Sequence, residues 1–133
     1  MFAFQVSAYD KTDLKKAKAT RDCSDCDLSS AFLSRADLNG ANLRKANLSD
    51  ADLSRADLSK ANLSDANLSS STLEHATLYN TDLSDTNLTQ VKNLSINKLS
   101  KVKTLYKAKL DPELIEQVKD KYPHLLKKPK SEE

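Results

Sequence analysis

Leucine recurs every five residues through the middle of this chain of 133 residues. In a strand, side chains alternate between faces, so leucines five residues apart point to opposite sides. On an α-helix, five residues advance about 500°, which leaves successive leucines about 140° apart. The period therefore predicts a repeat architecture. The thirteen leucines of the series are Leu28, Leu33, Leu38, Leu43, Leu48, Leu53, Leu58, Leu63, Leu68, Leu73, Leu78, Leu83 and Leu88.

Each unit also holds a small residue two positions before its leucine. Ala occupies this slot in nine units, and the other four carry Cys26, Ser71, Thr81 and Thr86. The residue between is mostly Asp or Asn, and two polar residues follow the leucine. Two apolar side chains separated by one residue share a face of a short extended segment.

One core can collect all the leucines if the chain turns by about 90° after every unit. Four turns then close a square coil of twenty residues, and coils stacked about 4.8 Å apart hydrogen-bond as parallel strands do. This arrangement predicts columns of residues spaced by twenty, such as Asp37, Asp57 and Thr77. Leucines fill the centre of the square and form the structural core.

The units read A(D/N)LXX, as in "ADLSRADLSK" at 51–60. Over residues 26–90 the sequence resembles the pentapeptide-repeat family. The resemblance implies a mainly β fold, a right-handed four-sided (quadrilateral) parallel β-helix solenoid, with short N- and C-terminal capping helices here. It is similar to cyanobacterial members, which often carry a signal sequence before a comparable cysteine pair.

A solenoid needs a cap at each end. We expect residues 1–25 to form an N-terminal segment with a helix near 12–19, capped by Asp10 or Thr12. Residues 26–90 form the solenoid, 91–124 a helical C-terminal cap, and 125–133 a flexible tail. The degenerate stretch "RDCSD" at 21–25 is expected to act as a first side.

The C-terminal part begins where the register breaks, because position 93 is Asn and the next leucine is Leu94. "SINKLSKV" predicts a short helical turn, and "KTLYKAKL" a last irregular side. "DPELIEQVKDKYP" predicts the clearest helix, with Asp111 as N-cap and Pro112 at the first helical position. Its apolar stripe, suited to cover the open coil, consists of Leu114, Ile115 and Val118.

Cys23 and Cys26 form a CxxC pair in two inward slots. A redox motif needs a thioredoxin-like setting, and zinc needs two further ligands that His75 and His124 do not supply. Two core thiols or a structural disulfide remain, and the compartment decides between them. "VSA" before Tyr9 resembles a signal-peptidase site, but Met1 to Val6 is too short for a signal. The alternatives are a cytoplasmic protein or a trimmed one of the periplasm or thylakoid lumen.

No catalytic constellation is present, and we expect no enzyme activity, cofactor or metal. Asp recurs before the leucines without paired acid and base environments, and no apolar run approaches the roughly 18 residues of a membrane span. The candidate surface contacts are exposed-slot residues: Phe32, Arg35, Arg55, His75 and Tyr79. Phe32 is expected to be covered by a terminal segment containing Phe2 and Phe4.

These features predict a monomeric, non-catalytic solenoid that serves as a protein–protein interaction or scaffold module, with an unknown protein partner and no nucleic acid. The alternative is a DNA mimic that modulates DNA gyrase or another topoisomerase, as some members of the family do. Such relatives are long acidic rods, whereas residues 26–90 carry nine acidic and five basic side chains, a net charge of −4. The short, weakly acidic repeat disfavours this alternative.

Overall fold

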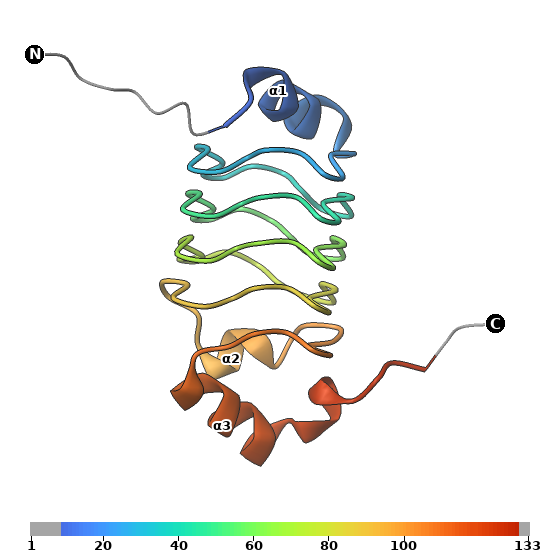
Figure 1. The fold of residues 1–133 in the computed structure, drawn as a ribbon, viewed down its shortest axis with the longest axis vertical. Helices are drawn as coiled ribbons and strands as arrows, with labels where there is room; N and C mark the ends of the chain where they lie inside the picture. Colours follow the sequence, from blue (N-terminus) through green and yellow to red (C-terminus); the bar gives the residue numbers. More distant parts are fainter. Residues whose placement is uncertain (1–8, 131–133) are drawn as a thin grey trace, which may run out of the picture.

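The computed structural model describes residues 9–130, which form a stack of coils closed by helices at both ends (Figure 1). Helix α1 (Lys11–Thr20) lies over the first coil. Helix α2 (Ile96–Leu99) lies in the layer of the irregular last coil, α3 (Pro112–Lys121) lies below that coil, and a 3-10 turn, η1 (Pro123–Leu126), follows α3. The segment 1–8, with Phe2, Phe4 and the "VSA" match, and residues 131–133 lie outside the described residues.

The coils are joined by parallel bridges between residues twenty apart, so four units make one turn of the solenoid. One column contains Asp37, Asp57 and Thr77, as the period predicts. Each side contributes a single bridge rather than a continuous strand, because a turn interrupts the chain after every unit. The β character of this solenoid therefore lies in isolated rungs.

The turns place one residue of every unit in the left-handed backbone region. From Asp25 to Gln90, every fifth residue has a φ between 55° and 68°. Only Gly40, the single glycine of the chain, has the residue type that adopts this region without steric cost. The turn is closed by a hydrogen bond from the N–H of the next unit's small residue to the leucine carbonyl, as from Ala61 N to Leu58 O at 3.0 Å. Regular turns at this spacing produce the square outline.

The core is a column of leucines inside the square. All thirteen repeat leucines are buried, and the small-slot alanines are buried with them, except that Ala36 is partly exposed. Toward the C-terminal end the small slot carries hydroxyls, which find backbone acceptors: Thr81 donates to Leu58 O at 2.8 Å and Thr86 to Leu63 O at 2.7 Å. Among the described residues, no buried side-chain polar atom lacks a partner.

The N-terminal cap begins at Asp10, whose carboxylate accepts hydrogen bonds from Thr12 N and Asp13 N. Of the two predicted capping residues, Asp10 takes the role. Asp13 then accepts from Asp27 N at 2.8 Å, a backbone group that has no coil above it. Ala17 is fully buried on the side of α1 that faces the core, so the helix closes the first coil with both polar and apolar contacts.

The C-terminal cap differs in detail from the sequence expectation. Val118 is fully buried as predicted, but Leu114 and Ile115 are only partly buried, and Leu99, Leu105 and Leu125 complete the cover. The boundary predicted at 125 is wrong, because Leu125 is buried and its carbonyl accepts from Leu105 N at 2.8 Å. Asp111 is the N-cap residue of α3, yet its carboxylate accepts from Gln90 N instead of a helical N–H.

Candidate functional site

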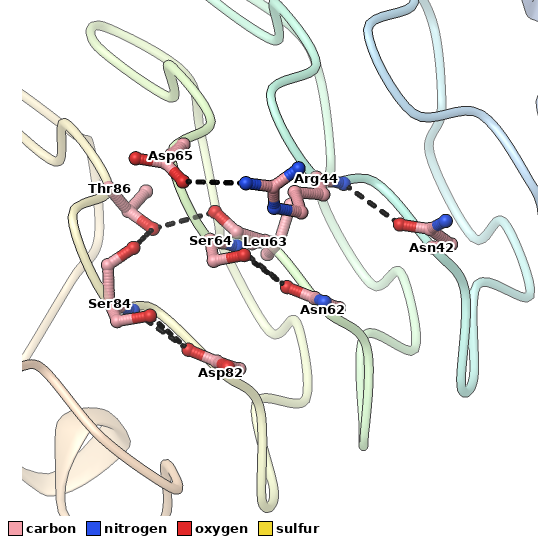
Figure 2. Close-up of polar contacts among 9 residues, drawn as sticks. All are labelled: Asn42, Arg44, Asn62, Leu63, Ser64, Asp65, Asp82, Ser84 and Thr86. Carbon is pink, nitrogen blue, oxygen red and sulfur yellow. Dashed lines mark hydrogen bonds and ion pairs between the residues drawn. The ribbon is translucent and has the colours of Figure 1, made fainter. Parts of the chain in front are cut away.

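The outward face of the solenoid is organised by the Asp or Asn before each leucine. Figure 2 shows one column of this position, with Asn42, Asn62 and Asp82. The Asn62 side-chain oxygen accepts from both the N–H and the hydroxyl of Ser64, at 2.9 and 2.6 Å. Asp82 binds Ser84 in the same way. The side chain thus fixes its own turn, as Asn and Asp commonly do.

These contacts also determine the protonation of two carboxyl groups. The hydroxyl and the N–H of Ser54 hold the pKa of Asp52 below its usual value, against a small opposing effect of burial. At Asp57 the N–H of Ser59 is the largest cause of a lowered pKa. A lowered pKa keeps the carboxylate ionised to more acidic pH than an ordinary aspartate, which suits a hydrogen-bond acceptor in a turn.

The three basic candidates from the sequence occupy turn positions. Arg35, Arg55 and His75 are spaced by one coil each, and all three have positive φ. His75 Nε2 lies 3.8 Å from Glu74 Oε1, and its side chain is 63% exposed. Because the turns point away from the core, these residues form an exposed row that contributes no buried chemistry.

The two aromatic candidates lie in separate places on the surface. Phe32 is 71% exposed in the outward slot that pairs with Asp52. The cover expected from Phe2 and Phe4 falls outside the described residues, and in the described structure Phe32 is open. Tyr79 is 59% exposed and borders the pocket described below. Exposed aromatic side chains are frequent anchors of protein interfaces.

Cys23 and Cys26 are joined by a disulfide bond at the start of the first coil. Cys23 is fully buried and Cys26 nearly so. The bond links the leucine slot of the degenerate first side to the small slot of the next unit. It therefore braces the side that packs beneath α1.

A pocket of about 490 Å³ opens beside α2, and Tyr79 is the one candidate from the sequence that lines it. Its lining includes Leu78, Tyr79, Lys98 and Lys101. The column of Asp37, Asp57 and Thr77 ends here, since α2 replaces the side that would continue it. In place of the backbone N–H of a complete side, Lys98 Nζ donates to Ala76 O at 3.1 Å, and it also donates to Leu73 O at 2.7 Å.

Burial lowers the pKa of Lys98. Neither Lys98 nor Lys101 takes part in the ion pairs found within residues 9–130. The pocket therefore presents two amines and an aromatic ring with no carboxylate opposite them. The register break at Asn93 was the sequence signal that one side would be missing, but it did not show which side chain would take its place.

The repeated part of the sequence matches the profile of a known family. The sequence profile described as "Pentapeptide repeats" matches residues 22–59 and 51–90 with eight copies, which is more than half of the chain. The chain belongs to the pentapeptide-repeat family. A comparison with curated proteins found no match. The β-helix solenoid expected from the period is thus the fold of its family.

Solved pentapeptide-repeat structures resemble the chain at low identity. One, from Nostoc Pcc 7120, is 24% identical over 81% of this chain and 100% of its own, with a TM-score of 0.36. Another, from the Arabidopsis thaliana thylakoid lumen, is 25% identical over 73% of this chain and 70% of its own, with a TM-score of 0.35. Full-length QnrB1, a plasmid-mediated fluoroquinolone resistance protein, is 16% identical over 73% of this chain and 65% of its own, with a TM-score of 0.35.

Within residues 9–130, no group of three or more His, Cys, Asp or Glu side chains is placed to hold a metal ion. No helix in the same part of the chain is long and apolar enough to cross a membrane. The features that remain for a pentapeptide-repeat protein of this kind are its exposed ladder surface and the pocket beside α2.

Proposed function

We propose that this chain is a non-catalytic solenoid, coiled in the right-handed sense of its family, that acts as a monomer through contact with another protein. The observation that carries the proposal is the exposure of two aromatic side chains, Phe32 at 71% and Tyr79 at 59%. Phe32 lies on a regular rung with Asp52, and the Tyr79 carbonyl accepts from Lys60 N at 2.8 Å, so little backbone conformational freedom is lost when a partner binds.

The carboxylates of the repeat favour a structural role over acid–base catalysis. In side chains such as Asp52 and Asp82, one carboxylate oxygen accepts hydrogen bonds from the N–H and the hydroxyl of the serine in the same turn. A general acid needs a pKa raised toward neutral, whereas the pKa values of Asp52 and Asp57 are lowered. This supports a structural role for these carboxylates rather than acid–base catalysis.

Affinity capture from the source cell tests the proposal. The tagged protein is compared with a Phe32→Ser, Tyr79→Ser double variant and with a charge-reversed Arg35→Glu, Arg55→Glu variant. A specific partner is expected to be retained by the wild type and lost by at least one variant with an unchanged melting temperature. Failure to enrich any protein, or equal recovery by all three, contradicts the proposal.

The rival function is a DNA mimic that acts on gyrase, and the charge distribution disfavours it. The repeat carries a net charge of −4, and the segment 91–133 carries eleven basic and six acidic residues. Two acids, Asp37 and Asp65, are also paired with Arg21 and Arg44. We expect no inhibition of DNA supercoiling and no protection of gyrase from quinolones. Inhibition at submicromolar protein would reverse the preference.

The disulfide supports a compartment that is oxidising, such as the periplasm or the thylakoid lumen, because such bonds persist there and are rare in the cytosol. Mass spectrometry of protein isolated from its native compartment, alkylated with and without reductant, tests this. Without reductant neither Cys23 nor Cys26 should be alkylated. Two freely alkylated thiols would place the protein in a reducing compartment.

A further inference from the structure

The pocket beside α2 contains a backbone donor without an acceptor. In twelve of the thirteen repeat leucines, the N–H donates to a carbonyl of the next coil, as from Leu58 to Thr77 O at 2.9 Å and from Leu83 to Thr104 O at 3.1 Å. Leu78 is the exception: its N–H has no acceptor among residues 9–130. Leu78 is only 2% exposed, and an unpaired backbone donor at such a position is costly.

The missing acceptor follows from the replacement of one side by α2. In a complete coil, the residue twenty positions after Thr77 would lie beneath it and supply the rung. That residue, Asn97, is instead inside α2. Lys98 supplies the donor that Ala76 O would otherwise lack, but an amine cannot supply an acceptor. The N–H of Leu78 therefore receives no acceptor from the layer below it.

The charges around the gap favour an acidic occupant. Lys98 and Lys101 line the pocket, and both lie outside every ion pair of the described residues. Tyr79 adds an exposed aromatic wall to the same lining. The site thus offers an N–H donor, two amines and an aromatic ring, and lacks an opposing carboxylate.

We propose that this pocket binds an extended acidic segment of a partner protein. A backbone carbonyl of the segment accepts from Leu78 N–H and supplies the missing rung, while an acidic side chain lies near Lys101 and Lys98. Binding by addition of an extended strand takes affinity from main-chain hydrogen bonds and specificity from the neighbouring side chains. The inference rests on the proposed protein-binding function and names the site and the chemistry of the partner.

The probe is a fluorescein-labelled peptide that alternates Glu with Thr, compared with the same peptide carrying Lys in place of Glu. Fluorescence anisotropy measures binding to the wild type, Lys101→Glu and Lys15→Glu. Lys15 is an exposed residue of α1, at the opposite end of the solenoid, and reversing its charge changes the net charge by the same amount. Circular dichroism confirms that each variant melts like the wild type.

We expect saturable binding of the Glu peptide alone, weakened about tenfold or more by Lys101→Glu and unchanged by Lys15→Glu. In a ¹H–¹⁵N spectrum the Leu78 amide should shift on titration, and the Leu58 amide should not. The inference is overturned if the Glu peptide fails to bind, if both variants weaken binding equally, or if the Leu78 amide does not move. A captured partner whose binding is insensitive to Lys101→Glu would overturn the pocket and leave the proposed function in place.

Discussion

The amine of Lys98 donates to the carbonyl oxygen of Leu73 at 2.7 Å, which ties α2 to the coil above it. The same amine reaches Ala76 O at 3.1 Å. At this end of the solenoid a side chain thus does what a backbone N–H does elsewhere. At the other end Asp13 plays the complementary part by accepting from Asp27 N. Charged side chains satisfy backbone groups that have no neighbouring coil.

Replacing Lys98 with Met should destabilise the protein by about 1–3 kcal/mol, because two carbonyl oxygens lose their donor. The matched control is Lys101→Met, which removes an equal charge from an exposed neighbour that makes no such side-chain bonds. Urea unfolding of both variants measures the difference. Equal stability of the two would show that the Lys98 contacts contribute nothing to the cap.

Acid should destabilise the wild type more than an Asp52→Asn, Asp57→Asn double variant. Both carboxyl groups have a pKa lowered in the folded state. Their stabilisation is therefore present above the unfolded value, near 4, and is lost as the pH falls through the lower folded values. Asn occupies the same slot at Asn47 and Asn62 and makes the same turn contacts, so the variant should fold.

Melting temperatures between pH 7 and pH 2 test this prediction. The wild type should lose more stability than the double variant on acidification. Asp50→Asn serves as a control, since the Asp50 side chain is exposed and makes no hydrogen bond within the described residues. Parallel pH profiles for the wild type and the double variant would contradict the prediction.

Leu58→Lys should unfold the protein or cost more than about 4 kcal/mol, since it places a charge in the centre of the coil. Leu58 is fully buried. Ser59→Lys, one residue along, should change stability by less than about 0.5 kcal/mol, because Ser59 is partly exposed on the outer face. Comparable melting temperatures for the two variants would refute the inward direction of the leucines.

Removing residues 91–133 should convert a monomer into an aggregating fragment. The deletion takes away the apolar cover of Leu99, Leu105, Val118 and Leu125 and leaves a row of bridging positions without partners. Light scattering on the 1–90 fragment tests this, and a folded, monodisperse monomer would refute it.

In the full chain, Val118→Asp should cost more than about 3 kcal/mol, whereas Gln117→Asp, on an exposed neighbour, should cost little.

The period of five was enough to predict the columns, because a single register places every leucine inside and every bridge twenty residues from the next. Thus Asp37, Asp57 and Thr77 were expected in one column and are found in one. A cap of α1 at Asp10 or Thr12, of which Asp10 takes the role, and Pro112 at the start of α3 were also predictable, since helix capping is a local property.

The pocket could not be predicted in this way. Its position depends on which side α2 replaces, and an irregular segment of eleven residues separates the bridging positions Lys92 and Thr104. The role of Lys98 depends on tertiary contacts with Leu73 and Ala76 that no sequence spacing encodes. Leu125 was missed for a related reason: it follows a helix-ending proline, which favoured a tail over a cap.

The most direct test of this account is native-state hydrogen exchange of the leucine amides. The ladder predicts slow exchange for Leu58, Leu73 and Leu83, whose N–H groups donate to the next coil at 2.9, 3.0 and 3.1 Å. The interrupted rung predicts that Leu78 exchanges much faster than these three, because its N–H opens on the pocket without a protein acceptor. Protection of Leu78 equal to that of Leu73 and Leu83 would contradict the missing rung and the site built on it.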